Sequence, residues 1–79
     1  MMKKQVKAIV ERTPDGGYSI YSDDDTLDYL VTGTGPTREE AIECFLGGYA
    51  DISTAYAEEG KPFTECKFTF VDAEVDAQG

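Results

Sequence analysis

The stretch PTREEAIECFLGGYADISTAYAEEG, residues 36–60, decides the fold because it predicts the one long helix of the chain. Thr37 and Glu40 have the spacing of a capping box, in which each side chain satisfies a free backbone N–H at the helix start. Gly60 is a typical residue just beyond a helix end, and Pro62 soon follows it. We therefore expect a helix over about 37–59.

Apolar side chains recur every three or four residues in this helix, which places them on one stripe facing a core. Burying them contributes on the order of 10 kcal/mol, whereas two adjacent glycines, Gly47 and Gly48, cost roughly 1 kcal/mol each. We expect one helix; two short helices broken at the glycines are the alternative. A line of small residues beside the stripe favours close approach to the helix's own sheet, and a subunit contact is the alternative. The stripe contains Ile42, Phe45, Leu46, Tyr49, Ile52 and Tyr56, and the small residues are Ala41, Cys44, Gly48 and Ala55.

Alternating apolar and polar residues predict strands at about 5–12, 18–22 and 65–71, and a run of good strand formers predicts another at about 28–33. The turn cluster at 13–17 joins the first two strands in a hairpin. Gly33 and Gly35 precede the helix without the rest of a phosphate-binding pattern, so we interpret them as turn residues. The polar tail, residues 72–79, is expected to be frayed.

The order of these elements predicts a single α+β domain over residues 1–79, a two-layer β-β-β-α-β sandwich. Short connections make the first three strands antiparallel. A right-handed crossover through the helix then brings the fourth strand beside the first and parallel to it, giving the sheet order 3-2-1-4. One helix covers one face of this sheet, which leaves the other face open.

The composition is acidic, with 16 Asp and Glu against 7 Lys and Arg, a net charge of −9. This charge disfavours direct binding to nucleic acid and suits a basic protein partner, although acidity also simply promotes solubility. The chain has no histidine, which removes the commonest general base and metal ligand. Cys44 and Cys66 are too few for a zinc cluster and are expected to be free thiols in the cytoplasm, although a disulfide between them is conceivable. No segment has the length or the pattern of a signal peptide or a membrane span.

The open sheet face is the surface that we expect to bind a partner. It combines apolar and basic side chains, and an acidic loop lies nearby. Consecutive carboxylates in an extended loop point away from each other, so we expect this loop to be solvated and to hold no metal. The candidate partner-binding residues are Lys7, Ile9, Tyr21, Asp23, Asp24, Asp25, Lys67 and Val71.

Three segments resemble the HicB family of antitoxins. Residues 6–11 followed by 15–21 look like that family's first hairpin, residues 33–41 resemble its entry into the helix, and a strand follows the helix in the expected place. The resemblance covers nearly the whole chain and implies a partial ribonuclease-H-like domain. Residues 22–26 depart from the family's Pro-Asp-Leu-Pro-Gly-like loop, and no helix-turn-helix pattern of the DNA-binding domain found in many members is present.

The resemblance implies a non-catalytic, antitoxin-like component of a type II toxin–antitoxin system. Such a domain neutralises a small, basic, RNA-cleaving toxin of the HicA type by occlusion. The alternative is a solitary self-associating HicB-like domain, and we expect a homodimer because sheet edges and one sheet face are open. We rank lower a small-ligand binder, for lack of room, and a metal-dependent nuclease, because the aspartates lie in turns. A nuclease would use Asp15, Asp23, Asp24, Asp25 or Asp28. We expect no catalytic residue, no metal and no cofactor.

Overall fold

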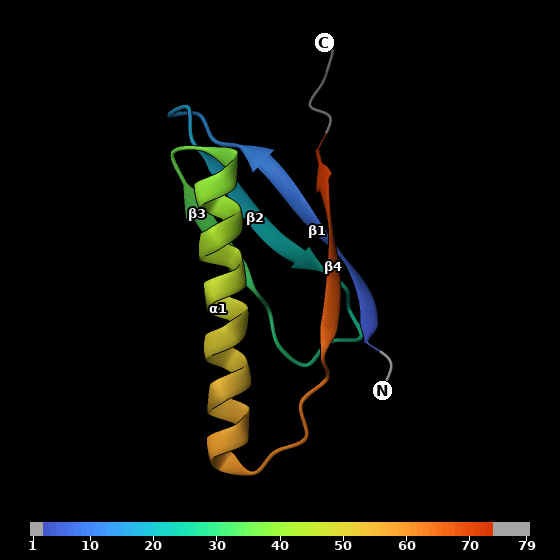
Figure 1. The fold of residues 1–79 in the computed structure, drawn as a ribbon. Coiled ribbons are helices and arrows are strands. Elements are labelled where there is room, and N and C mark those ends of the chain that lie inside the picture. The colour runs from blue at the N-terminus through green and yellow to red at the C-terminus, as the bar shows by residue number, and fades with distance from the viewer. Residues whose placement is uncertain (1–2, 74–79) are drawn as a thin grey trace.

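A computed structural model describes residues 3–73 and shows one helix packed on one face of a four-stranded sheet (Figure 1). The sheet order is β3-β2-β1-β4, with β1–β2 and β2–β3 antiparallel and β1–β4 parallel. The α+β architecture and the sheet order derived from the sequence are therefore confirmed. The elements are β1 (Lys4–Arg12), β2 (Tyr18–Asp23), β3 (Thr32–Gly35), α1 (Arg38–Glu59) and β4 (Cys66–Asp72).

The hairpin between β1 and β2 closes through a turn that satisfies its own polar groups. The Thr13 N–H donates to the Gly17 carbonyl oxygen at 3.0 Å. The Asp15 carboxylate accepts a hydrogen bond from the Thr13 hydroxyl and another from the Gly17 N–H. These bonds, the one from Thr13 first, hold the pKa of Asp15 below its usual range. The turn thus fixes the register in which Val10 lies opposite Ile20.

Helix α1 begins and ends where its capping residues indicate. The Thr37 side chain accepts a hydrogen bond from the Glu40 N–H at 3.1 Å. At the other end Gly60 has φ = 69°, a left-handed conformation that costs glycine little, and its N–H donates to the Ala57 carbonyl oxygen. The helix continues through Gly47 and Gly48 without a break, so the alternative of two short helices is wrong.

The strand before the helix differs from the expected one. Strand β3 runs from Thr32 to Gly35 rather than over 28–33, so Gly33 and Gly35 are strand residues and their interpretation as turn residues is wrong. A Cβ atom on Gly33 would lie 2.4 Å from the Phe45 backbone nitrogen, and one on Gly35 would lie 2.7 Å from that of Ala41. The two glycines are therefore needed because the helix backbone touches the strand.

This contact places α1 to one side of the sheet. The backbone of α1 approaches β3 and β2 closely, whereas β4 lies at the far side, beyond β1 (Figure 1). Ala41 and Gly48 of the small-residue line face β3, with a Cβ on Gly48 only 3.4 Å from the Thr32 carbonyl oxygen. Cys44 and Ala55 of the same line are exposed. The preference for a contact within the chain is thus confirmed for two of the four residues.

The core lies between α1 and the inner face of the sheet. Phe45 is fully buried, and the rings of Phe68 and Phe70 pack edge-on against it at 4.8 and 5.5 Å between centroids. Leu46, assigned to the buried stripe from the sequence, is 43% exposed. The remaining core side chains are small or branched: Val6, Ala8, Val10, Ile20, Val31, Ala41 and Cys66.

The end of β4 corrects the expected tail. Asp72 belongs to the strand and pairs with Arg38 at 2.9 Å between carboxylate oxygen and Nε. The Ala73 N–H donates to the Val10 carbonyl oxygen at 2.8 Å. Ordered structure therefore continues through 73, and the rest of the expected frayed tail, 74–79, lies outside the described residues.

Candidate protein-binding surfaces

The face of the sheet opposite α1 gathers most of the residues expected to bind a partner. Tyr21, Ile9 and Val71 lie side by side across β2, β1 and β4. In the next row Lys7 lies opposite Asp23, and Lys67 lies further along β4 on the same face. Six of the eight candidate residues therefore share one surface.

This sheet face is only modestly apolar. Val71 is 38% exposed, and Ile9 and Tyr21 are half-buried. Lys7 and Lys67 are exposed beside them, as are Glu11 and Asp23. The face is consequently balanced in charge rather than acidic.

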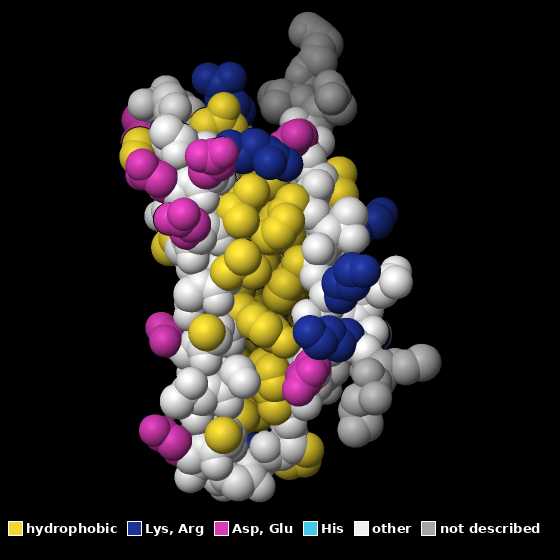
Figure 2. All heavy atoms as spheres, in the orientation of Figure 1, with side chains coloured by type: hydrophobic (Ala, Val, Ile, Leu, Met, Phe, Trp, Pro, Cys, Tyr) yellow, Lys and Arg dark blue, Asp and Glu magenta, His cyan; other side chains and the backbone are white. Residues whose placement is uncertain are grey.

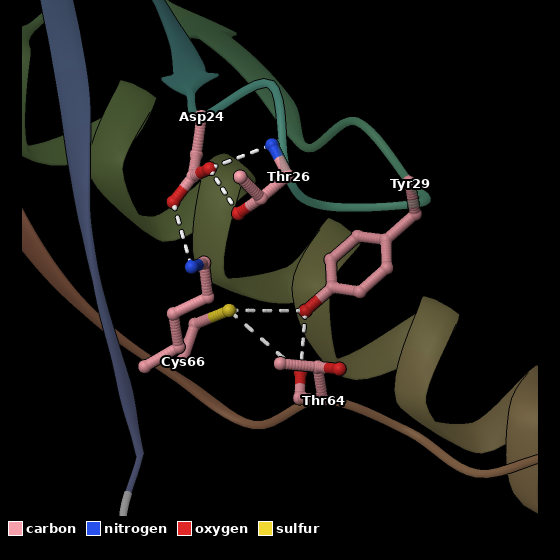
Figure 3. A network of polar contacts seen from close by, with 6 residues as sticks. Asp24, Thr26, Tyr29, Thr64 and Cys66 are labelled. Carbon is pink, nitrogen blue, oxygen red and sulfur yellow. Dashed lines mark hydrogen bonds and ion pairs between the residues drawn. The ribbon is translucent and has the colours of Figure 1, made fainter.

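The acidic loop does not extend this surface as a unit. The Asp24 carboxylate accepts hydrogen bonds from the Thr26 N–H at 2.8 Å and the Thr26 hydroxyl at 2.5 Å, and it pairs with Lys4 at 3.5 Å (Figure 3). The bonds from Thr26 come first among the causes that lower the pKa of Asp24. Lys4 shares the inward-facing row of β1 with Val6, so Asp24 ties the loop to β1. Asp25 is exposed in the turn that follows.

The aspartates considered for a nuclease are not brought together. Asp15 lies in the turn before β2, and Asp23, Asp24 and Asp25 lie at the other end of that strand. Asp28 accepts a hydrogen bond from the Tyr56 hydroxyl at 3.2 Å. Within residues 3–73 no three His, Cys, Asp or Glu side chains are placed to hold a metal ion.

A hollow of about 430 Å³ lies between the β1–β2 turn and residues 34–36. That size is within the range of small-molecule sites, so the expectation that the domain has little room for a pocket is wrong. Its carboxylate, Asp15, is already bonded to Thr13 and Gly17. The hollow is therefore lined mainly by turn backbone and small polar side chains and offers no free charged group to a ligand.

The outer surface of α1 carries a row of acidic side chains that the sequence analysis missed. Four exposed acids lie within about 80° of one another around the helix and span about 27 Å of its length. Figure 2 shows acidic side chains spaced along this outer edge. Their spacing of three, eight and seven residues is a signal that the sequence already contained. This acidic row consists of Glu40, Glu43, Asp51 and Glu58.

The space between α1 and β4 shows a second surface that the sequence analysis missed. Figure 2 shows a continuous band of hydrophobic side chains between the helix and β4. Tyr49 links the two sides, with its ring 5.1 Å from that of Phe68 and 5.5 Å from that of Phe63. We call this band the apolar strip; it comprises Ile42, Leu46, Tyr49, Phe63, Phe68 and Phe70. All are half-buried except Leu46, which is exposed.

The lower end of the apolar strip is fixed by polar contacts. The Tyr29 hydroxyl donates to the Thr64 carbonyl oxygen at 2.7 Å and lies 3.1 Å from the Cys66 sulfur (Figure 3). The Tyr29 ring stacks on Phe63 at 5.3 Å. Burial, followed by the contact with Cys66, raises the pKa of Tyr29 above its usual value. Cys66 is buried and Cys44 is exposed, and both are free thiols.

No family model, curated protein or solved structure matches this chain. In the part of the chain that the structure describes, no helix is both long enough and apolar enough to cross a membrane.

Proposed function

We propose that this chain is a non-catalytic protein-binding domain, an antitoxin-like component of a type II toxin–antitoxin system. Its partner is a small, basic, RNA-cleaving protein of the HicA type, which it neutralises by covering the RNA-binding surface. The observation that carries the proposal is the acidic row on α1.

The acidic row suits a partner that normally binds RNA. Helix α1 contains six acids and one base, Arg38, and that base is already paired with Asp72. A protein that grips a phosphate backbone presents several Lys and Arg side chains in a line. Carboxylates spaced along a rigid helix can occupy the same basic side chains, and complementary charge also speeds the encounter.

The open sheet face is the alternative contact surface. Lys7 and Lys67 lie on it beside Glu11 and Asp23, so this face is balanced in charge and attracts a basic partner less than the acidic row does. We therefore assign the main contact to α1 and retain the sheet face, with Ile9, Tyr21 and Val71, for a secondary contact.

The architecture supports the resemblance on which this proposal partly rests. The β-β-β-α-β order, the hairpin at residues 6–21 and the capped helix that starts after Thr37 are the features that the resemblance to HicB-like antitoxins implies. We place the protein in the cytoplasm, a compartment that suits the free thiols of Cys44 and Cys66.

The test compares two variants that lose the same charge. The row variant combines Glu40→Gln, Glu43→Gln, Asp51→Asn and Glu58→Gln. The control combines Glu11→Gln, Asp23→Asn, Asp25→Asn and Glu65→Gln. All eight side chains are exposed. Each tagged protein is used at low salt to capture partners from extract of its own cells, with mass spectrometry of what co-elutes.

We expect the unaltered chain and the control to recover one small basic protein in stoichiometric amount, and the row variant to lose it. Raising the salt should release it, because the contact is electrostatic. The recovered protein should cleave RNA when alone and not when the chain is added back. If the row variant and the control captured the partner equally well, the contact would not lie on the acidic row of α1. Recovery of the chain alone would contradict the proposal and favour the solitary self-associating domain.

A further inference from the structure

The open sheet face carries a row of apolar side chains that the chain itself does not cover. We call it the apolar row; it crosses β2, β1 and β4 and consists of Tyr21, Ile9 and Val71. Leu30, which is 64% exposed, adds to this side of the sheet. The residues before and after it, Tyr29 and Val31, pack against α1 and in the core, so Leu30 points to the open side. Large apolar side chains exposed together are typical of an interaction surface.

Charge restricts the surface through which two copies of this chain can meet. The net charge of −9 makes two copies repel each other, and the acidic row of α1 would add to that repulsion. On the open sheet face two bases and two acids are all exposed, so the local charges cancel. These four residues are Lys7, Lys67, Glu11 and Asp23. The open sheet face is therefore a surface on which a second acidic chain can dock without a charge penalty.

We propose that a second copy of this chain covers the open sheet face, about a two-fold axis that crosses the strands at Ile9. Two sheets packed face to face lie about 10 Å apart. This axis reverses the strand direction, so β1 of one copy runs antiparallel over β1 of the other. Lys7 and Glu11 stand two residues before and two residues after Ile9 on the same face. Lys7 of each copy therefore meets Glu11 of the other, at two symmetric places, and the apolar row lies over its own counterpart.

The position of Glu11 selects this axis over the other one. A two-fold axis along the strands would keep each row of the sheet over the same row of the other copy. The row of Glu11 continues with Ser19 and Thr34 and contains no base, so Glu11 would meet no positive charge. Among the described residues, none of the ion pairs includes Lys7 or Glu11, so both side chains are available to the other copy. Only the axis across the strands pairs them.

This dimer is compatible with the proposed function and does not depend on it. Helix α1 covers the opposite face of the sheet, so the acidic row stays open to a basic partner (Figure 1). The secondary contact left to the sheet face is then a contact between copies of the chain. Partner capture and dimerisation use different surfaces, and each can fail while the other succeeds.

Light scattering after size exclusion, from about 20 to about 500 µM chain in about 150 mM NaCl, measures the dimer directly. Val71→Asp should raise Kd about 10-fold, because it places a charge in the apolar row of both copies. The matched control is Leu46→Asp, which adds the same charge at a residue that is 43% exposed on α1. It should leave Kd unchanged, and circular dichroism of both variants checks that they fold.

The arrangement is tested by exchanging the two charges. Lys7→Glu brings two acids together between the copies, and Glu11→Lys brings two bases together, so each should raise Kd about 10-fold. The double variant Lys7→Glu/Glu11→Lys restores both pairs and should return Kd to within about 3-fold of the unaltered chain. The two single variants change the net charge in opposite directions, so a general charge effect would shift their Kd values in opposite directions.

Three results would overturn the proposal, whatever the partner capture shows. The first is a monomer throughout the concentration range. The second is a dimer that Leu46→Asp weakens and Val71→Asp does not, because the contact would then lie beside α1. The third is a double variant that dimerises no better than Lys7→Glu alone, because Lys7 and Glu11 would then not meet between the copies.

Discussion

The two long flanks of α1 are built on opposite principles. Towards β3 the helix backbone touches the strand backbone, because Gly33 and Gly35 have no side chains to hold them apart. Towards β4 the helix and strand are separated by aromatic rings, of which Phe68 and Phe70 are only half-buried. The flank towards β3 is closed because Gly33 and Gly35 have no side chains. The flank towards β4 stays open although it carries the largest side chains.

The difference shows what positions a single helix on a wide sheet. Burial of large side chains is non-directional and would be satisfied by several placements of the helix. Backbone contact at two glycines has one geometry, and a Cβ at either position excludes it. The smallest residues therefore set the position of α1, and the aromatic residues fill the space that remains.

Replacing the glycine at the closest point should break the closed flank and have the largest effect. Gly33→Ala introduces a Cβ 2.4 Å from the Phe45 nitrogen, a collision with backbone that no rotamer change relieves. We expect a loss of about 3 kcal/mol in the free energy of unfolding, measured by urea denaturation. Gly48→Ala, with a nearest contact of 3.4 Å, is the control. Unchanged stability of Gly33→Ala would mean that α1 can shift towards β4.

Truncating an aromatic residue on the open flank should cost less than a core truncation. Phe68→Ala removes a half-buried ring that packs on Phe45 and Tyr49. We expect a loss of about 2 kcal/mol, below the roughly 3–5 kcal/mol of a fully buried Phe. Urea denaturation measures the loss, and Phe45→Ala supplies the reference for a buried ring.

Removing the other helix glycine should strengthen the helix without touching either flank. A Cβ on Gly47 meets no atom within 4 Å. Gly47→Ala should therefore raise the unfolding free energy by about 0.5–1 kcal/mol through helix propensity alone. A loss of stability on thermal or urea denaturation would mean that the helix needs flexibility at this position.

The smallest expected effect concerns Tyr29, at the end of the flank towards β4, and it appears only at alkaline pH. Burial beside Cys66 raises the pKa of Tyr29 above its usual value near 10. Because the folded-state pKa is the higher one, the stabilisation is complete below the unfolded-state pKa and is lost as the pH rises above it. Urea midpoints at pH 9 and pH 11 should fall less for Tyr29→Phe than for the unaltered chain. If the urea midpoints of Tyr29→Phe and the unaltered chain fell equally, ionisation of Tyr29 would not contribute to alkaline unfolding.

The architecture was predictable from the sequence because local signals agreed with each other. Turn residues at 13–17, capping by Thr37 and Gly60, and alternation in β1 and β4 each indicated one element, and the handedness of the crossover then left one topology. The start of β3 was not predictable, because Tyr29 and Val31 are good strand formers that here serve the aromatic cluster and the core. Glycines before a helix usually indicate a turn, and only the tertiary contact shows why Gly33 is in a strand.

The candidate surfaces were predictable in part. The alternation of residues along the strands predicted that Lys7, Ile9, Tyr21 and Val71 share one face of the sheet, and the strand register of the structure confirms it. The acidic row could have been found from helical spacing. The apolar strip could not, because its existence depends on how far α1 lies to one side, and no local pattern encodes that displacement. The ion pair of Asp24 with Lys4 likewise joins residues far apart in sequence.

The pairing of the first strand with the last also governs the order of events in folding. Lys4 lies opposite Cys66, so about 60 residues must be closed into a loop before β4 can join, whereas the hairpin closes over a handful. The difference in closure entropy is on the order of 2 kcal/mol. The hairpin should therefore form early and β4 should dock last. By the same reasoning β4 is the first strand to detach in native fluctuations, which would expose the edge of β1 and the aromatic rings together.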